Sequence, residues 1–389
     1  MEEKQKQLRR LVENSFPHVT NFHEKVSVEF EKLENAKSFW SEIYVAHLKV
    51  NEGVKDVEVP GDVFIKVPRI SENVLRCEDE EAVDELQNVL VYYSKKENLF
   101  YKHFPYGTIP NFPFPKVYFT EDVAGEATGG IVAENLSEKV FAVEHIPGLN
   151  HEQILRLMEA LAGFHSHLMK REDKSYVESF EEGAHGRETY APGMQNMMFE
   201  EALTLESVNP EVFGNGRIQN IKWAFDYSKK TKATKEAISA IPGIICHADM
   251  NVTNMLWKKD SPNNEIGAII DYQMLFIGSV AFDIIRILTL GMTREERREK
   301  TESYLEYYHK TLAEFFDGQA PFSMEELHRQ YNLIYPFASN FTLFGIALYI
   351  KMYSDGTLGN IEKKEENCEE LVDRARGIVE DIEALKANF

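Results

Sequence analysis

Polar side chains follow two short apolar runs in the stretch from residue 244 to residue 287. His247 and Asp249 come after the first run, Asn254 lies five residues beyond Asp249, and Asp271 follows the second run. Polar residues at the ends of buried strands are held rigidly and still reach solvent, which suits catalytic work. One carboxylate would serve as a base, and an Asn and an Asp oxygen would serve as ligands of a metal ion. The set therefore fits Mg²⁺-dependent phosphoryl transfer to a hydroxyl group.

These residue types also have ordinary structural uses. Asp and Asn near turns commonly form Asx turns or cap helices, and the segment 249–254 is consistent with a solvated loop. For a single residue the structural interpretation is preferred. Four such residues in register at the ends of two apolar runs favour the catalytic interpretation.

Composition limits both the class of protein and its partners. With 389 residues, 43% of them hydrophobic and 12% aromatic, the chain is a folded globule long enough for two lobes with sizeable cores. The formal net charge is −21, from 64 acidic and 43 basic residues. Binding to nucleic acid or to an anionic membrane needs clustered Lys and Arg, so neither is an expected partner.

Cysteine usage and the amino terminus indicate the compartment. Cys77, Cys246 and Cys368 are odd in number, widely separated and without C-x-x-C spacing, which predicts reducing surroundings and no zinc knuckle. The first residues are charged and are typical of an amphipathic helix, not of a secretory signal. The longest apolar stretch, residues 337–350, is shorter than the ~20 residues that span a membrane. We therefore expect a cytoplasmic protein that does not cross a membrane.

A lysine lies within an apolar strand near the amino terminus. Alternation along the strand 63–67 places Lys66 on the same face as Phe64, where a lysine is commonly a surface residue. If that face lines a cleft, the ammonium group needs a carboxylate or phosphate partner. Glu97 falls on the apolar stripe of the helix predicted over residues 80–104. The two residues indicate the ion pair by which kinases orient a phosphate-binding lysine, with a solvated Glu97 as the alternative.

Strands dominate the amino-terminal part of the chain and helices the remainder. Short β-branched and aromatic runs bounded by Gly, Pro and Asn predict antiparallel strands at 26–30, 43–50, 62–67, 117–120 and 130–133. Apolar residues at helical spacing predict helices at 1–14, 80–104, 151–169, 194–205, 210–240, 293–316, 324–350 and 366–385, with a charged, mobile loop over 170–195. This order predicts an α+β layout with two unequal lobes, residues 1–133 and residues 134–389.

The assembled motifs resemble the protein-kinase-like superfamily, specifically its aminoglycoside phosphotransferase and choline kinase branch. They are most similar to the CHK-kinase-like group of that branch, which includes the ecdysteroid kinase-like proteins of invertebrates. The resemblance follows the order of elements over roughly residues 25–355 and is specific at 64–67, 96–101, 247–254 and 270–273. It matches the kinase signatures H-R-D-x-x-x-x-N and D-F-G, with Ala248 at the Arg position and Tyr272-Gln273 after the Asp.

The resemblance implies a role for each matching residue of the second lobe. Asp249 would accept the proton of the acceptor hydroxyl, and Asn254 and Asp271 would bind the Mg²⁺ that bridges the phosphates of ATP. His247 would support the catalytic loop, and Asp283 would brace it. The implied fold is two-lobed and kinase-like, with an antiparallel sheet in the first lobe and mostly helices in the second.

Further roles are implied for the first lobe. Lys66 would hold the nucleotide phosphates and Glu97 would orient Lys66. Glu134 and Leu136 would meet the adenine through backbone groups.

The chain departs from the protein-kinase pattern in two places. Residues 35–42, between the first strands, contain no glycine. Contacts with phosphate would then come from backbone amides and from the hydroxyls of Ser38 and Ser41. No A-P-E segment follows Asp271, which disfavours a protein substrate.

The predicted function is an ATP- and Mg²⁺-dependent phosphotransferase acting on a hydroxyl of a small molecule, such as a sterol-like, choline-like or xenobiotic alcohol. No protein partner is indicated. One alternative is a metal-dependent hydrolase using His165, His167, His247, Asp249 and Asp271. The first two of these stand two residues apart on a predicted helix and would point to different sides. The other alternative is a catalytically inactive, kinase-like binding protein.

Overall fold

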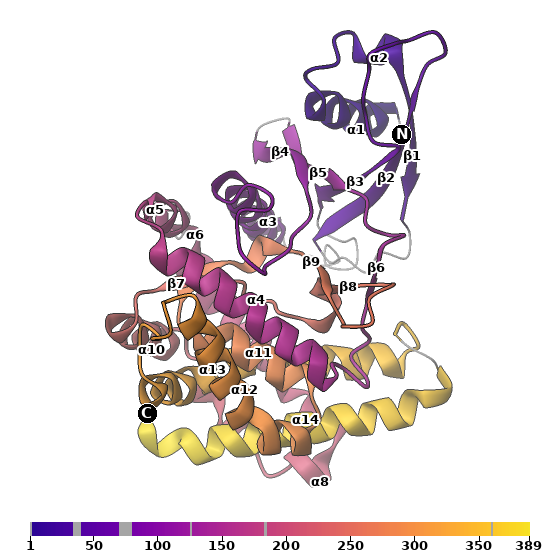
Figure 1. The fold of residues 1–389 in the computed structure, drawn as a ribbon. Helices are drawn as coiled ribbons and strands as arrows, with labels where there is room; N and C mark the ends of the chain where they lie inside the picture. Colours follow the sequence, from indigo (N-terminus) through magenta and orange to yellow (C-terminus); the bar gives the residue numbers. More distant parts are fainter. Residues whose placement is uncertain (1, 34–39, 70–79, 125–126, 183–184, 359–360) are drawn as a thin grey trace. The chain divides into compact units, whose positions relative to one another are not determined.

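The structure is a computed structural model, and it describes residues 2–33, 40–69, 80–124, 127–182, 185–358 and 361–389 (Figure 1). The chain divides into two compact units. The amino-terminal unit comprises Met1–Thr108 and Phe114–Val140, and the carboxyl-terminal unit comprises Ile109–Pro113 and Phe141–Phe389. The main division therefore lies between residues 140 and 141, compared with a predicted boundary between residues 133 and 134.

Local hydrogen bonding explains where the units divide. The N–H groups of Lys139 and Val140 donate to the carbonyl of Leu136, at 2.8 and 3.1 Å, which keeps the segment after the last strand of the first unit within that unit. The excursion at 109–113 joins the other unit because the Pro113 carbonyl accepts from the N–H of Ile269 at 2.8 Å. Phe112 also stacks on Phe164, with ring centroids 4.5 Å apart.

The amino-terminal unit is built on one five-stranded antiparallel sheet of order β1-β2-β3-β5-β4 (Figure 1). Its strands are β1 (Val26–Lys32), β2 (Ser41–Val50), β3 (Asp62–Pro68), β4 (Val117–Ala124) and β5 (Ala127–Glu134). Its helices are α1 (Glu2–Ser15), α2 (Phe22–Lys25) and α3 (Glu80–His103). The predicted strand meander and the predicted long helix are confirmed.

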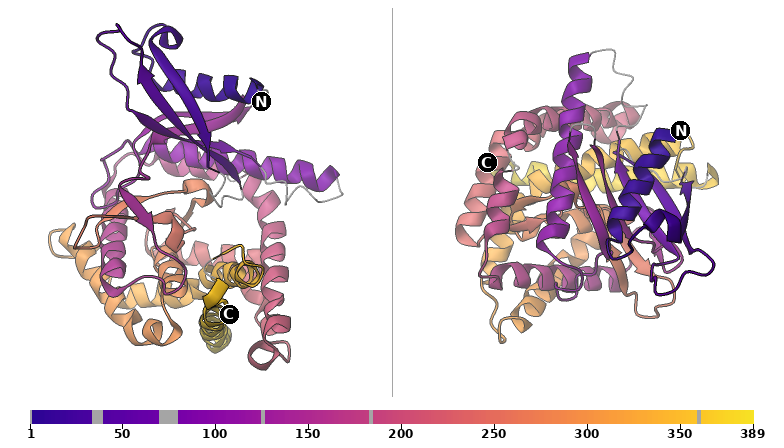
Figure 2. Two further views of the ribbon diagram at one scale, coloured as in Figure 1. Left: turned by 90° about the vertical axis from the view of Figure 1, so that its right-hand side faces the viewer. Right: turned by 90° about the horizontal axis from the view of Figure 1, so that it is seen from above.

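The two faces of the sheet pack against different helices, because successive side chains of a strand point to opposite sides. Val63 and Ile65 of β3 are buried in a cluster with Leu11 of α1. Phe64 and Lys66 point the other way, and Lys66 meets α3 through an ion pair. Figure 2 shows the sheet between α1 and α3. The face that α1 leaves uncovered therefore carries the lysine.

The carboxyl-terminal unit is mostly helical (Figure 1). Its helices are α4 (His151–Lys170), α5 (Ser175–Glu182), α6 (His185–Leu203), α7 (Leu205–Val208), α8 (Pro210–Phe213), α9 (Arg217–Asn220), α10 (Tyr227–Ala240), α11 (Ala281–Gly291), α12 (Arg294–Glu314), α13 (Met324–Ser354) and α14 (Lys364–Leu385). Single 3₁₀ turns are η1 (Lys222–Phe225), η2 (Val252–Asn254), η3 (Tyr272–Met274), η4 (Ile361–Lys363) and η5 (Lys386–Asn388).

Short strands position the chemistry-bearing segments. Strand β7 (Ile244–Cys246) pairs with β10 (Phe276–Gly278), and β6 (Val140–Ala142), β8 (Met255–Lys258) and β9 (Ile266–Ile269) form a second small sheet. All three residues of β7 are buried. Burial on all sides explains why an apolar run of only three residues is enough to fix the loop that follows.

Side-chain caps begin several of the predicted helices. Asn150 and Gln153 form a reciprocal capping box at the start of α4, Thr293 accepts from the N–H of Glu296 in α12, and the Ser323 hydroxyl caps α13. Each cap satisfies an N–H group that has no partner inside the helix. The predicted starts of these helices are confirmed.

Two segments differ from the sequence prediction. The predicted mobile loop over 170–195 contains α5 and most of α6, because Tyr176 and Phe180 lie one helical turn apart and are both buried. The region predicted as helical over 210–240 is divided into α8, α9, η1 and α10. Gly216, at a φ of 71°, adopts the left-handed backbone that separates α8 from α9.

Helix α13 is the most apolar long helix of the unit. By length and composition it is able to cross a membrane: an 18-residue window reaches a mean hydropathy of 1.5. Of that window, 67% is buried inside the protein. The apolar stretch 337–350, which is shorter than a membrane span, is part of this longer helix, and so is Pro336.

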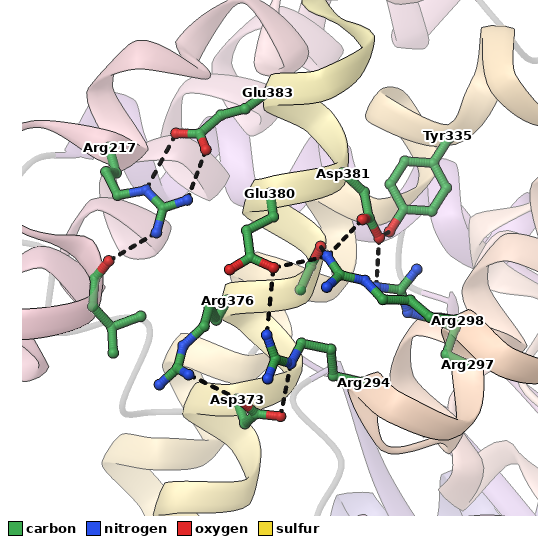
Figure 3. A network of polar contacts seen from close by, with 12 residues as sticks. Arg217, Arg294, Arg297, Arg298, Tyr335, Asp373, Arg376, Glu380, Asp381 and Glu383 are labelled. Carbon is green, nitrogen blue, oxygen red and sulfur yellow. Dashed lines mark hydrogen bonds and ion pairs between the residues drawn. The ribbon is translucent and has the colours of Figure 1, made fainter.

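Ion pairs hold α14 against α12 and α13 (Figure 3). Asp381 of α14 forms an ion pair with Arg297 at 2.6 Å, and it accepts hydrogen bonds from Arg298 at 2.8 Å and from the Tyr335 hydroxyl at 3.0 Å. Neighbouring pairs join Arg294 to Asp373 and Glu380, Arg298 to Glu380, Arg376 to Asp373, and Arg217 to Glu383. We call the cluster of Arg297, Arg298, Tyr335 and Asp381 the α14 network.

Candidate catalytic site

The loop after β7 is fixed by one carboxylate at the start of α11. The N–H groups of His247 and Ala248 donate to the two oxygens of Asp283, at 2.7 and 2.8 Å. Ala248 has a φ of 68°, a left-handed conformation that costs energy for a residue with a side chain. The two hydrogen bonds to Asp283 hold the backbone in that conformation, so Asp283 lies where a brace of the loop was predicted.

The imidazole of His247 joins the loop to the segment before Asp271. Its Nδ1 accepts from the N–H of Asp249 at 3.3 Å, so the proton is assigned to Nε2, which donates to the carbonyl of Ile270 at 3.0 Å. The N–H of Ile270 in turn donates to the carbonyl of Asn254 at 3.0 Å. Both backbone groups of Ile270 are therefore bonded to the loop, which places Asp271 beside it.

The carboxylate of Asp249 is held through each of its oxygens. Asn254 Nδ2 donates to Oδ2 at 3.1 Å and to the Asp249 carbonyl at 3.0 Å, and Arg286 donates to Oδ1 at 3.3 Å. The Asp249 side chain remains 20% exposed. Burial raises the pKa of Asp249, the charge of Arg286 opposes that rise, and the charge of Asp271 adds to it. A carboxylate in this state has a higher proton affinity than an ordinary aspartate, which favours work as a base.

Asp271 and Asn254 supply oxygen atoms near this carboxylate. Asp271 follows β9 with a φ of 72°, and its Oδ2 accepts from the side-chain amide of Gln273 at 3.3 Å. Because Asn254 uses its Nδ2 to donate to Asp249, its Oδ1 is left as the acceptor side of the amide. A carboxylate and an amide oxygen are hard ligands of the kind that Mg²⁺ prefers, so the residues present fit that ion.

The amino-terminal unit contains the predicted ion pair. Lys66 Nζ lies 2.7 Å from Glu97 Oε2, and the two side chains are 14% and 5% exposed. Glu97 is therefore not a solvated residue at the edge of α3, and Lys66 is not an ordinary surface lysine. A buried carboxylate fixes the ammonium group in one orientation.

The remaining predicted residues of this unit have mixed outcomes. Ser41 begins β2 opposite Pro68, and Ser38 lies outside the described residues. Glu134 ends β5, its N–H donates to the Lys116 carbonyl, and its side chain accepts from the Lys116 N–H, both at 2.9 Å. The Leu136 carbonyl accepts from two N–H groups of the following turn. These backbone groups are thus engaged within the chain, and the adenine contact of Glu134 and Leu136 stays a prediction.

Sequence reasoning missed the residues that surround Asp249 from α11 and α13. Arg286 was not singled out, although an arginine inside the apolar helix AFDIIRILTLG requires a buried partner. Tyr349 was not singled out either, yet its hydroxyl accepts from Asn251 Nδ2 at 2.5 Å. Burial raises the pKa of Tyr349 to about 12, with a further contribution from Asp249. No local pattern shows which helix faces the loop.

Two histidines of the hydrolase alternative, His165 and His167, lie on α4. His165 is fully buried in α4, and its Nδ1 is 2.7 Å from the hydroxyl of Tyr308. Burial lowers the pKa of His165 to about 3. Among the described residues, no group of three or more His, Cys, Asp or Glu side chains gathers as a metal site.

Comparison with known proteins places this geometry in a class. The chain is 32% identical to "Uncharacterized kinase-like protein D1044.1" of Caenorhabditis elegans. The match covers 96% of this chain and 98% of that protein. Together with the antiparallel sheet, the helical second unit and the paired Lys66 and Glu97, this defines a kinase-like protein. The chain belongs to the DUF1679 family, described as "Uncharacterized oxidoreductase dhs-27", whose model matches residues 29–388.

Other similarities are more distant. The chain is 24% identical over 216 residues to "Uncharacterized oxidoreductase dhs-27" of C. elegans, a match that covers 52% of this chain and 25% of that protein. Among solved structures it is similar to an aminoglycoside phosphotransferase in complex with GDP and kanamycin, with 12% identity, 98% of each chain covered and a TM-score of 0.43. It is also similar to a Plasmodium vivax ethanolamine kinase, with 11% identity, 92% and 82% covered and a TM-score of 0.43.

Proposed function

We propose that this protein is an ATP- and Mg²⁺-dependent phosphotransferase that phosphorylates a hydroxyl group of a small molecule. The observation that supports this most is the pairing of Asp249 with Asn254, joined to Asp271 through the two backbone bonds of Ile270. A base and two oxygen ligands are thereby held next to one another. The full-length match to a kinase-like protein agrees with this assignment.

The residues divide the chemistry among them. As the acceptor oxygen bonds to the γ-phosphorus, the bond from that phosphorus to the oxygen shared with the β-phosphate breaks, and ADP leaves. The proton of the acceptor hydroxyl passes to Asp249, whose raised pKa suits a base. Lys66, oriented by Glu97, binds the phosphates of the nucleotide.

The metal ion would be held by Asn254 and Asp271. When bound, Mg²⁺ neutralises charge on the nucleotide phosphates. His247 and Asp283 contribute indirectly, since they fix the backbone that carries these ligands. We place Ser41, Glu134 and Leu136 at the nucleotide as well, following the resemblance of the first unit to kinases.

The acceptor is proposed to be an alcohol of low molecular mass, either sterol-like, choline-like or xenobiotic. A small acceptor is favoured because the chain lacks an A-P-E segment after Asp271. The compartment is proposed to be cytoplasmic, in keeping with the free thiols of Cys246 and Cys368.

A thermal-shift titration with ATP tests the nucleotide site first. Saturation at ~100 times the dissociation constant stabilises the native state by about 2.7 kcal/mol, so the midpoint of unfolding rises. We expect the rise with Mg²⁺ present, a loss of the rise in EDTA, and a loss in Asp271→Ala. The matched control is Asp260→Ala, which removes an exposed acidic residue from the β8–β9 turn and should keep the rise.

Phosphotransfer is then measured as ADP release with a panel of hydroxylated compounds: an ecdysteroid, choline, ethanolamine, an aminoglycoside and benzyl alcohol. ADP release above that in water, dependent on Mg²⁺ and lost in Asp249→Asn, supports the assignment. Absence of any ADP release would overturn it and favour a non-catalytic binding protein, whether or not a thermal shift is seen.

A further inference from the structure

Arg286 is a buried cation in an otherwise apolar helix. Its side chain is 3% exposed, and it lies on α11 among isoleucine and leucine residues. Nη2 donates to Asp249 Oδ1 at 3.3 Å, and Nη1 donates to the hydroxyl of Thr342 on α13 at 2.7 Å. The guanidinium carbon lies 4.3 Å from the centroid of the Phe341 ring. Thr342 and Phe341 hold the guanidinium group in the orientation that meets Asp249.

One turn of α11 therefore contacts the catalytic loop twice. Asp283 binds the backbone N–H groups of His247 and Ala248, and Arg286, three residues later on the same helix face, binds the side chain of Asp249. The backbone and the carboxylate of the loop are thus tied to the same rigid segment. A carboxylate held only by the loop itself would rotate about its side-chain torsions.

We propose that Arg286 is a positioning residue of the phosphotransfer reaction, which orients the Asp249 carboxylate toward the acceptor hydroxyl. The inference rests on the proposed function. Arg286 occupies Oδ1 while Asn254 occupies Oδ2, so the plane of the carboxylate is fixed and each oxygen keeps a further lone pair for the hydroxyl. Arg286 also balances the negative charge of Asp249, which leaves Asp271 as the carboxylate for the metal ion.

Stability alone does not explain this arginine. A buried ion pair is often no more stabilising than apolar residues of similar volume, and burial here lowers the pKa of Arg286 against the opposing effect of Asp249. The Nε of Arg286 is also buried without a hydrogen-bond partner among the described residues. The groups that face Asp249 are Arg286 from α11, Asp271 after β9 and Tyr349 from α13, and of these only Arg286 is a cation.

The test is a double-mutant cycle on turnover. Arg286→Met and Asp249→Asn are made singly and together, and kcat and the KM for ATP are measured as ADP release. The acceptor is the panel compound that gives the largest turnover. If no compound gives more ADP release than water does, water is the acceptor. Arg286→Met should lower kcat by about 10²-fold. The KM for ATP should stay within about 3-fold of the parent value, and the thermal shift caused by MgATP should stay within about 1 °C of it. In the Asp249→Asn background the same substitution should change kcat by less than about 2-fold, because its target is already gone.

Two further variants separate positioning from folding. Arg286→Lys, which keeps the charge but cannot reach Asp249 and Thr342 together, should recover part of the lost kcat. Arg297→Lys alters an arginine of similar burial in the α14 network and should lower the midpoint of unfolding while leaving kcat unchanged.

The outcomes are distinguishable. Equal loss of kcat from Arg286→Met in both backgrounds, or parent-level kcat in that variant, would overturn the role of Arg286 and leave the proposed function standing. A parent protein that releases no ADP under any of these conditions would overturn the proposed function, and the role of Arg286 with it.

Discussion

Two regions of the carboxyl-terminal unit each bury an arginine beside an aspartate, with opposite electrostatic results. In the α14 network, burial works to lower the pKa of Arg297, but electrostatic interactions with Tyr335 and Asp381 outweigh it and the pKa is raised. At the catalytic loop, burial prevails, so that the pKa of Arg286 is lowered and that of Asp249 is raised.

The number of donors on each carboxylate explains the difference. Asp381 receives two arginines and a tyrosine hydroxyl, whereas Asp249 receives one arginine, at 3.3 Å, and one amide. Three partners around Asp381 favour the charged form of Arg297, whereas the fewer partners of Asp249 leave burial as the larger effect on its pKa. The comparison indicates that the α14 network serves the fold and that the pair at the loop serves the site.

Removal of the loop carboxylates should have the largest effect on turnover. Asp249→Asn and Asp271→Ala should each lower kcat by about 10³-fold or more, since one removes the proposed base and the other a proposed metal ligand. Circular dichroism and the midpoint of unfolding, measured beside kcat, should show a native fold. Near-normal turnover in both variants would show that neither loop carboxylate is needed for catalysis.

The matching change in the α14 network should act on stability. Asp381→Ala leaves two arginines and a tyrosine without their shared acceptor, and loss of one partner of a buried pair costs about 3 to 5 kcal/mol. Urea unfolding measures that loss, and kcat per folded molecule should stay at the parent value. Glu369→Ala, in an exposed position of α14, is the control. A loss of kcat with unchanged stability would assign the network to catalysis instead.

A third carboxylate extends the comparison to pH. Burial works to raise the pKa of Glu42 in β2, but hydrogen bonds from Lys4 and Arg69 outweigh it and the pKa falls to about 2 from 4.5. Its stabilisation is therefore fully present above about pH 4.5 and is lost as the pH falls toward about 2. Asp249, with its raised pKa, behaves in the opposite sense: its ionisation disfavours the native state as the pH rises.

Glu42→Gln tests that assignment. The variant should lose about 2 to 3 kcal/mol of unfolding free energy at pH 7, and the gap from the parent should close near pH 2. Urea unfolding across that range measures the gap, with Glu52→Gln, an exposed acid in the turn after β2, as the control. If the difference in unfolding free energy between variant and parent did not depend on pH, ionised Glu42 would not be a source of stability.

The smallest expected effect sharpens the role of Arg286. Thr342→Val removes the acceptor of Arg286 Nη1 but leaves Arg286 and Asp249 in place. A guanidinium group with one anchor less is less well oriented, so kcat should fall about 5-fold with less than about 1.5 kcal/mol of stability lost. Thr311→Val, at a buried threonine of α12, should leave kcat unchanged. Equal kcat in the two variants would show that Thr342 does not orient the arginine.

Much of the fold and site follows from local pattern, with identifiable exceptions. The antiparallel strands, the long helix that carries Glu97 and the capped helices α4, α12 and α13 were predictable, because periodicity and caps are local signals. Helix α5 and the first part of α6 were not predicted, because the charged and glycine-containing stretch 170–195 favoured a loop. The assignment of residues 109–113 to the second unit depended on long-range contacts, such as that of Pro113 with Ile269.

The sequence by itself determined which chemical groups are available: the proposed base, the proposed oxygen ligands, the strand lysine and the helix glutamate were all identified from residue type and spacing. Only the tertiary structure decided which of these groups meet, and it added Arg286 to Asp249 from a helix 37 residues away in the chain. The physical reason is that a side chain's charge state depends on its burial and on its partners, and both are set by contacts between segments that no local pattern brings together.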